Sequence, residues 1–182
     1  MAQEKIAAHR KRLPHHVPSW VDHSAVFFVT VCALPRGSNI LCQPNLAKGL
    51  WEAVVFRQGR GHWWVHLLLL MPDHLHMLVS FPDDQRMDKV VSAWKRYLAR
   101  QESIHWQRDF FDHRLRSQES LSQKSEYILK NPVRAGLVQT AEEWPYVWRG
   151  DLHGWEALAG STDRFDEQRV RRTRPTGSHS SE

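Results

Sequence analysis

Several features that mark large classes of protein are missing from this 182-residue sequence. It has only two cysteines, Cys32 and Cys42, which form neither a disulfide framework nor a paired-thiol motif. No apolar run is long enough to span a membrane, and the N-terminus has no apolar signal-peptide core. A glycine-rich phosphate loop ending in Lys-Ser or Lys-Thr is absent as well. We therefore expect a soluble, cytoplasmic protein with no membrane partner, in which both cysteines are packing residues.

The central part of the chain also lacks a large excess of positive charge. The whole sequence has a net charge of +5, but residues 24–160 carry 16 basic and 14 acidic side chains. A binding site for a polyanion must therefore come from a local arrangement of cations and not from the field of the whole domain. What the sequence does have in unusual number is tryptophan, nine in all, so some indoles are candidates for stacking on bases.

The composition divides the chain into one domain and two flanking segments. Residues 1–23 are basic and are interrupted by Pro14 and Pro18, which predicts a mobile N-terminal arm. Residues 161–182 are polar, with almost no apolar side chains, which predicts a disordered tail. The residues between them, 24–160, are enough for one domain with a sizeable core and too few for two.

Apolar patterns within that domain predict an α+β fold. Strands are expected at 25–34, 62–70 and 74–81, and helices at 44–58, 87–101 and 118–131. This order indicates a ferredoxin-like antiparallel sheet with helices packed mainly on one face. Residues 105–116 have no clear period and fit either a loop or a short edge strand. Trp144, Trp148 and Trp155 are expected to pack a C-terminal segment onto the domain.

A pair of histidines one residue apart stands at the head of an apolar run, Met-Pro-Asp-His-Leu-His-Met-Leu-Val, at residues 71–79. Side chains alternate between the two faces of a strand, so His74 and His76 should share one face. Met-Pro-Asp before the pair favours a hairpin turn. With twelve histidines in the chain, roughly one such pair is expected by chance, so the spacing alone is a weak signal of a metal site.

The predicted helix at 87–101 is strongly amphipathic. Its apolar stripe consists of Met87, Val91, Trp94 and Leu98. Three basic residues, Lys89, Arg96 and Arg100, fall nearly opposite. Such a basic stripe is either a solvated face or a surface that binds phosphates.

The helix at 118–131 has a core line of Leu121 and Ile128. On its flank lie Lys124, Tyr127 and Asn131, and the last two are one helical turn apart. A tyrosine in this position is usually a packing residue with its hydroxyl at the surface. The chain has only two other tyrosines, Tyr97 and Tyr146, and we expect Tyr97 to be structural or a platform for base stacking.

Two motifs together resemble a known family. Met-Pro-Asp-His-Leu-His-Met-Leu-Val is followed about fifty residues later by Tyr-Ile-Leu-Lys-Asn-Pro-Val-Arg-Ala-Gly-Leu-Val, which begins at Tyr127. In composition, order and separation the two motifs are similar to those of the REP-associated tyrosine transposases, relatives of the single-tyrosine HUH transposases. The resemblance covers roughly residues 24–150.

The resemblance implies a role for each matching residue. His74 and His76 would hold a divalent metal, Tyr127 would be the nucleophile that cuts single-stranded DNA, and Asn131 would complete the metal site. We expect the DNA to be bound by five basic residues, Lys89, Arg96, Arg100, Lys124 and Arg134.

The implied function is a metal-dependent endonuclease and strand transferase that forms a 5′-phosphotyrosine intermediate on single-stranded or hairpin DNA. Mg²⁺ or Mn²⁺ would be the cofactor, and the protein would act as a monomer or homodimer. Two alternatives remain open. The same sheet and basic helix would serve a module that binds nucleic acid without cutting it, and the chain would equally fit an inactive, domesticated relative of the family.

Overall fold

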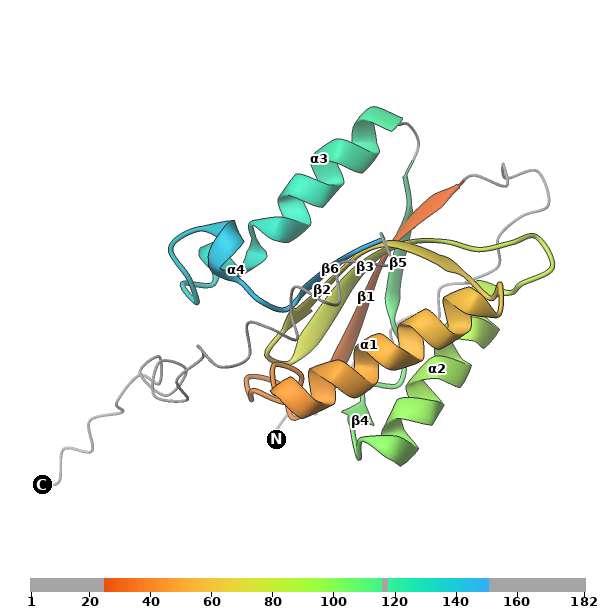
Figure 1. Cartoon of the computed structure of the whole chain (residues 1–182), viewed down its shortest axis with the longest axis horizontal. Coiled ribbons are helices and arrows are strands. Elements are labelled where there is room, and N and C mark those ends of the chain that lie inside the picture. The colour runs from red at the N-terminus through yellow and green to blue at the C-terminus, as the bar shows by residue number, and fades with distance from the viewer. Residues whose placement is uncertain (1–24, 116–117, 151–182) are drawn as a thin grey trace, which may run out of the picture.

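The computed structural model of the chain describes residues 25–115 and 118–150 (Figure 1). The predicted N-terminal arm at 1–23, the predicted tail at 161–182 and Trp155 lie outside the described residues. Side chains are described throughout these ranges except at 118–120. None of the helices within them combines the length and hydrophobicity needed to cross a bilayer.

Four helices of α type, one 3₁₀ turn and six strands make up the described part of the chain. In order they are β1 (Val26–Leu34), α1 (Pro44–Gly59), β2 (Trp64–Met71), β3 (His74–Ser80), α2 (Met87–Gln101), β4 (His105–Trp106), β5 (Phe111–Arg114), α3 (Gln118–Leu129), α4 (Asn131–Arg134), η1 (Ala141–Glu143) and β6 (Val147–Arg149). The predicted helices and the three long strands are all present, with bounds within a few residues of those expected.

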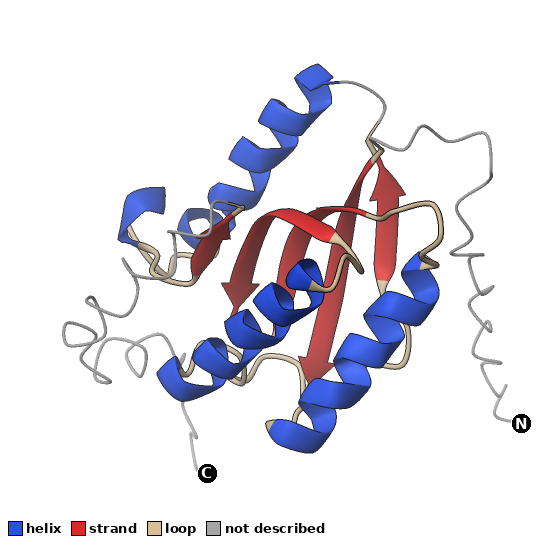
Figure 2. Ribbon diagram, turned by 45° about the vertical axis from the view of Figure 1, so that its right-hand side comes forward, coloured by secondary structure: helices blue, strands red, loops and turns tan. Residues whose placement is uncertain are grey.

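The strands form one antiparallel sheet in the order β4-β1-β3-β2-β6, with β5 also paired to β1 (Figures 1 and 2). This arrangement confirms the predicted α+β fold. The described part of the region that fitted either a loop or an edge strand, residues 105–115, contains two short strands, β4 and β5, both paired with β1. Strand β6, only three residues long, was not predicted, because so short a segment has no readable alternation.

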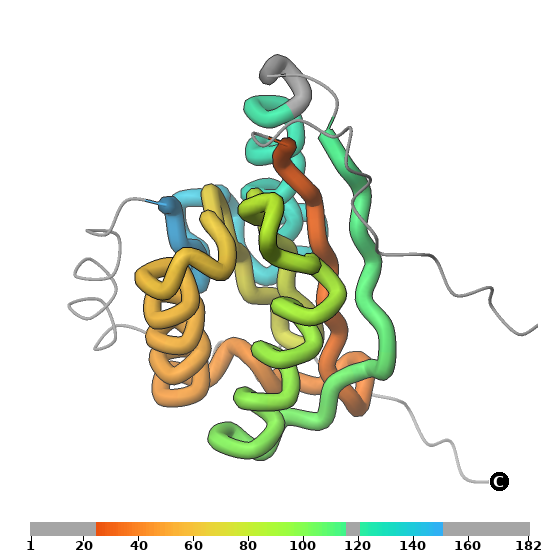
Figure 3. The backbone as a smooth tube through the Cα atoms, turned by 90° about the vertical axis from the view of Figure 1, so that its right-hand side faces the viewer, coloured from red at the N-terminus to blue at the C-terminus, as the bar shows by residue number. Residues whose placement is uncertain are grey.

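The two longest helices, α1 and α2, lie side by side on one face of the sheet (Figures 2 and 3). The sheet side chains that face them are apolar and buried, and in the central strands they are Phe27, Val29, Val31, Leu75, Met77 and Val79. The predicted stripe of α2 is confirmed, since all four of its residues are at most 1% exposed. Trp94 of that stripe contacts Trp63 edge to face, with ring centroids 5.4 Å apart. This side of the sheet is therefore the main hydrophobic core.

Helix α3 packs on the opposite face. Phe28 neighbours Phe27 in β1 and so projects away from the main core, and the ammonium of Lys124 in α3 lies 4.8 Å from the centroid of its ring. Ile128, on the predicted core line of α3, is fully buried. Trp144 and Trp148 are buried as expected, and the Trp144 indole N–H donates a hydrogen bond of 2.8 Å to the carbonyl oxygen of Leu70. These contacts hold the C-terminal elements to the sheet.

Candidate active site

The histidine pair begins strand β3, which lies between β1 and β2 in the sheet. As predicted, both side chains project from one face, and their ring centroids are 4.9 Å apart with the ring planes at 80°. This is the face against which α3 packs. His76 is opposite Thr30 in the strand register, and Thr30 is on the same face as Phe28, whose ring contacts Lys124 of α3. The α1–α2 core therefore lies on the other side of the sheet from the imidazoles.

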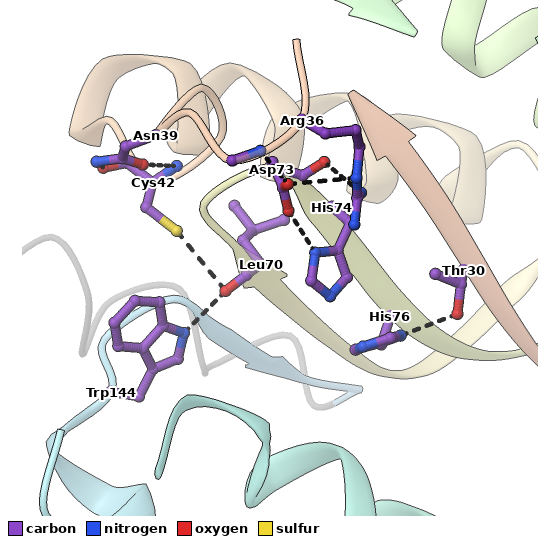
Figure 4. Close-up of polar contacts among 10 residues, drawn as sticks. Thr30, Arg36, Asn39, Cys42, Leu70, Asp73, His74, His76 and Trp144 are labelled. Atoms are coloured by element: carbon purple, nitrogen blue, oxygen red, sulfur yellow. Dashed lines mark hydrogen bonds and ion pairs between the residues drawn. The ribbon is translucent and has the colours of Figure 1, made fainter. Parts of the chain in front are cut away.

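The ring of His74 is oriented by the residue before it. Nδ1 of His74 donates a hydrogen bond of 2.7 Å to Oδ1 of Asp73 (Figure 4). The other carboxylate oxygen of Asp73, Oδ2, accepts a hydrogen bond of 2.7 Å from the backbone N–H of Gly37. It is also 3.3 Å from Nε of the Arg36 guanidinium. Gly37 has φ +77°, a backbone conformation that glycine adopts at no steric cost. The turn after β1 and the turn before β3 thus fix each other through one carboxylate.

The ionisation of Asp73 suits this role. Partial burial by itself raises the pKa of the Asp73 carboxyl, but the hydrogen bonds from Gly37 and His74 and the charge of Arg36 together lower it below its ordinary value. The group is therefore an anion at neutral pH. As an anion it accepts from Nδ1–H of His74, which leaves the lone pair of that imidazole on Nε2.

The ring of His76 is more deeply enclosed, with 9% of the residue exposed. A hydrogen bond of 2.9 Å joins its Nδ1 to Oγ1 of Thr30 on β1 (Figure 4), and the ring of Phe28 stacks against it at a centroid distance of 5.4 Å. Burial, with smaller contributions from His74 and Lys124, lowers the pKa of His76 from 6.5 to about 3. The imidazole is therefore neutral at pH 7, the form that can donate a lone pair to a metal.

These two rings meet the requirements of a pair of metal ligands. A ligating imidazole binds the metal through one nitrogen and holds a carboxylate, carbonyl or similar partner with the other. Both Nδ1 atoms have such a partner, and among the described residues no hydrogen bond engages either Nε2. Within the same residues no three His, Cys, Asp or Glu side chains are grouped closely enough to hold a metal ion. A metal here would have the two imidazoles and take its other ligands from an amide, water or substrate.

Helix α3 places Tyr127 on the same side of the sheet as the histidines, as the contacts of Lys124, another residue of that helix, show. The ammonium of Lys124 is 4.8 Å from the ring centroid of Phe28, which stacks on His76, and 5.2 Å from that of Tyr127. The guanidinium of Arg134 lies over the same tyrosine ring at 4.5 Å. The tyrosine is 46% exposed, so part of its surface is open to a ligand although two cations lie over its ring.

The predicted third ligand, Asn131, is engaged at the end of α3. Its side-chain nitrogen donates to the carbonyl oxygens of Tyr127 at 3.2 Å and Ile128 at 3.0 Å. The last carbonyls of a helix lack partners within it, so the amide acts as a cap for them. Among the described residues no hydrogen bond joins Asn131 to either histidine, and its Oδ1 would be the atom that binds a metal. The role of this residue as a ligand stays a prediction.

The other two tyrosines occupy different environments. Tyr97 is on α2, across the sheet from the histidines, where the guanidinium of Arg57 lies 5.1 Å from its ring centroid. Tyr146 is half-buried against Trp144, and burial, helped by Cys42, raises the pKa of its phenol to about 12. A phenol so hard to ionise is a poor nucleophile. Of the three, Tyr127 alone is connected to the histidine face.

Comparisons with known proteins show what the whole chain is similar to. No protein-family model matches the chain. A putative REP-associated tyrosine transposase of Haemophilus influenzae is 29% identical over 96 residues, and the match covers 43% of this chain and about half of that protein, 54%. A REP-associated tyrosine transposase of Escherichia coli is 25% identical over 127 residues, covering 66% of this chain and 73% of the relative. The chain is thus similar in sequence to REP-associated tyrosine transposases, and it spans about half the length of the first of them.

A solved structure shares the fold. It is a REP-associated tyrosine transposase bound to a REP hairpin, with a TM-score of 0.62 at 20% identity over 78% of this chain and 82% of that one. Similarity at this identity concerns the arrangement of helices and strands. It supports the fold expected from the resemblance to these transposases.

The five basic residues predicted to bind DNA fall into two groups on opposite sides of the sheet. Lys89, Arg96 and Arg100 are exposed on α2, on the side away from the histidines. Lys124 and Arg134 flank Tyr127. The second group is beside Tyr127, the nucleophile that the resemblance implies, whereas the first is on a separate surface. The sequence pattern could not reveal this separation, because it depends on which face of the sheet each helix covers.

Three contributors to the site were not found from the sequence. Asp73 was assigned only to a turn, although its position next to His74 was a usable signal for an orienting carboxylate. Thr30 and Phe28 meet His76 only through the register of β1 on β3, which pairs residues 46 positions apart. Local sequence patterns carry no information about such a contact.

Proposed function

We propose that this chain is a transposase-like enzyme that binds hairpin DNA and cuts and rejoins a single strand by way of a covalent bond to Tyr127. The observation that carries the proposal is the histidine pair. Two imidazoles on one strand face have their Nδ1 atoms held by Asp73 and Thr30, and among the described residues no hydrogen bond engages either Nε2. Helix α3, which bears the tyrosine, packs on the same face. The solved structure with a similar fold is that of a transposase bound to a REP hairpin, which supports hairpin DNA as the substrate.

His74 and His76 would hold the divalent metal, Mg²⁺ or Mn²⁺, with Asn131 as a candidate third ligand. When bound, the metal supplies positive charge that neutralises the nonbridging oxygens of the scissile phosphate. The protein contributes the orientation of the two rings, through Asp73 and Thr30, and keeps His76 neutral by burying it. Holding the ring planes in place reduces the reorganisation that ligand binding requires.

Tyr127 would act as the nucleophile. Its hydroxyl loses its proton to solvent and its oxygen forms a bond to phosphorus, while the bond from phosphorus to the 3′ oxygen breaks. That oxygen takes up a proton from solvent and leaves as a 3′ hydroxyl. The DNA is then joined to the protein through a 5′ phosphate. Attack by a 3′ hydroxyl on the same phosphorus reverses the step and returns the tyrosine, so rejoining needs no ATP. Lys124 and Arg134, the two cations on the tyrosine ring, would attract the phosphate.

The test is the covalent adduct. Labelled single-stranded oligonucleotides with hairpin structure are incubated with the protein and Mg²⁺ or Mn²⁺, then run on denaturing gels. We expect the wild type to be linked to the fragment downstream of the cut, through its 5′ phosphate, and Tyr127→Phe, which removes only the nucleophilic oxygen, to form no such adduct. Tyr97→Phe is the matched control, because Tyr97 is exposed to nearly the same extent, 45%, on the far side of the sheet.

Two results would contradict the proposal. An adduct that persists in Tyr127→Phe and disappears in Tyr97→Phe or Tyr146→Phe would assign the nucleophile to another residue. Binding of hairpins by the wild type without any cleavage in either metal would favour the alternative, a module that binds nucleic acid without cutting it.

A further inference from the structure

Phe111, the first residue of β5, is exposed on the histidine face of the sheet. Its partner in the register is Thr30, the residue that holds His76, so the two side chains project from the same face. The phenylalanine is 51% exposed, whereas the preceding Phe110 packs against the core. The two consecutive phenylalanines thus have opposite environments. Burial in the core explains the apolar side chain of Phe110, but it does not explain that of Phe111.

The ring of Phe111 is connected to the histidine pair by one other ring. It meets Phe28 edge to face, with centroids 6.2 Å apart, and Phe28 stacks on His76. The ammonium of Lys124 lies over the same Phe28 ring. An exposed aromatic face, a cation and the proposed metal ligands therefore lie within a few side chains of each other.

The position of Phe111 is fixed from the far side of the sheet. Lys95, a buried residue of α2, donates hydrogen bonds from its ammonium to the carbonyl oxygens of Gln107 at 2.8 Å, Arg108 at 3.0 Å and Asp109 at 3.4 Å. These three residues form the loop that leads from β4 into β5. A charge placed among three carbonyls holds that loop firmly, so the exposed ring is presented by a rigid support.

A single exposed phenylalanine needs no explanation by itself, and the chain provides a comparison. Phe56, on α1, is 59% exposed, but it lies on the side of the sheet away from the histidines, and the guanidinium of Arg60 is 5.4 Å from its ring centroid. Phe111 differs in being on the histidine face and on a β-strand braced by a buried lysine. Aromatic rings interleaved with cations are the usual means by which proteins bind single-stranded nucleic acid, because every base can stack on a ring.

We propose that Phe111 is a stacking platform for an unpaired base of the DNA, next to the nucleotide whose phosphate reaches the histidine pair. This inference rests on the proposed function and adds a base-binding position to it. The ring would hold the strand while Lys124 neutralises its backbone. Stacking is tolerant of sequence, so Phe111 would position the strand without selecting one base.

The test uses hairpin oligonucleotides with a single-stranded flank in which each flanking base in turn is replaced by 2-aminopurine, whose fluorescence is quenched when it stacks. All proteins carry Tyr127→Phe so that no DNA is cut. We expect quenching at one flank position on binding, its loss in Phe111→Leu, and its return in Phe111→Trp. Affinity for the flanked hairpin should fall about tenfold in Phe111→Leu. Phe56→Leu, the matched control, should leave both readings unchanged.

The inference is overturned if Phe111→Leu retains the quenching and the affinity, or if Phe56→Leu loses them to the same extent. Cleavage by a protein with an intact Tyr127 is measured in parallel, so the two proposals are separable. Normal cleavage with no effect of Phe111→Leu would reject the stacking platform and keep the transposase-like activity. Failure of the wild type to bind any hairpin would reject both.

Discussion

The two faces of the sheet differ in polarity and in exposure to solvent. The face toward α1 and α2 is apolar and closed, with the tryptophans Trp63 and Trp94 in contact and almost no exposed surface. The face toward α3 carries the His74–His76 pair, the hydroxyl of Thr30, cations and exposed aromatic rings. Strand β3 contributes side chains to both faces, because its residues alternate between the core and the site.

The difference in polarity assigns stability to one face and ligand binding to the other. The closed face stabilises the fold through buried apolar area, and so it can hold β3 rigidly while the other face keeps polar groups partly unpartnered. Each Nε2 atom of the histidine pair is such a group. Substitutions on the closed face should therefore reduce stability, whereas substitutions on the open face should reduce ligand binding with little effect on folding.

The largest effect is expected from Trp94→Ala on the closed face. The side chain is fully buried among aromatic rings, so its removal leaves a cavity and should lower the free energy of unfolding by about 3 to 5 kcal/mol. Chemical denaturation followed by circular dichroism measures this. A loss below about 1 kcal/mol would mean that this face is not the main source of stability.

A smaller effect, on binding and not on folding, is expected from Thr30→Val on the open face. Valine keeps the shape and the strand preference of threonine but removes the oxygen that holds Nδ1 of His76. Affinity for Mn²⁺ should fall about 10- to 100-fold, in line with the loss of other partners of metal ligands. The matched control is Ser80→Ala, because Ser80 holds the ring of His66 on the same face through a hydrogen bond of 2.8 Å. Equal losses in the two variants would contradict a specific role for His76.

The smallest effect concerns the basic residues on the outer surface of α2. If Arg96 and Arg100 contact DNA, changing both to glutamine should flatten the slope of log affinity against log salt by about 1 to 2, given roughly 0.7 per single-strand phosphate contact. Lys124→Gln provides the comparison from the open face. An unchanged slope for the α2 variant, with a reduced slope for Lys124→Gln, would restrict DNA binding to the histidine face.

Local patterns in the sequence were sufficient for the elements and for one feature of the site. The stripe of α2 follows a period of 3.6 residues and the shared face of His74 and His76 follows a period of 2, so both could be read directly. The contacts of Thr30, Phe28 and Lys124 with the pair could not, because they depend on the register of β1 and on the face that α3 covers. The same limit applied to Tyr97, whose separation from the histidines is visible only in the folded chain.

The account depends most on the claim that the histidine pair binds a divalent metal on the open face. Titration of Mn²⁺, with the free ion followed by electron paramagnetic resonance, tests this without DNA or activity. We expect one site per chain in the wild type, its loss in His76→Ala, and its retention in His66→Ala, because His66 is on the same face but is bonded to Ser80 and is not one of the pair. Equal binding of Mn²⁺ by the wild type and His76→Ala would contradict the claim.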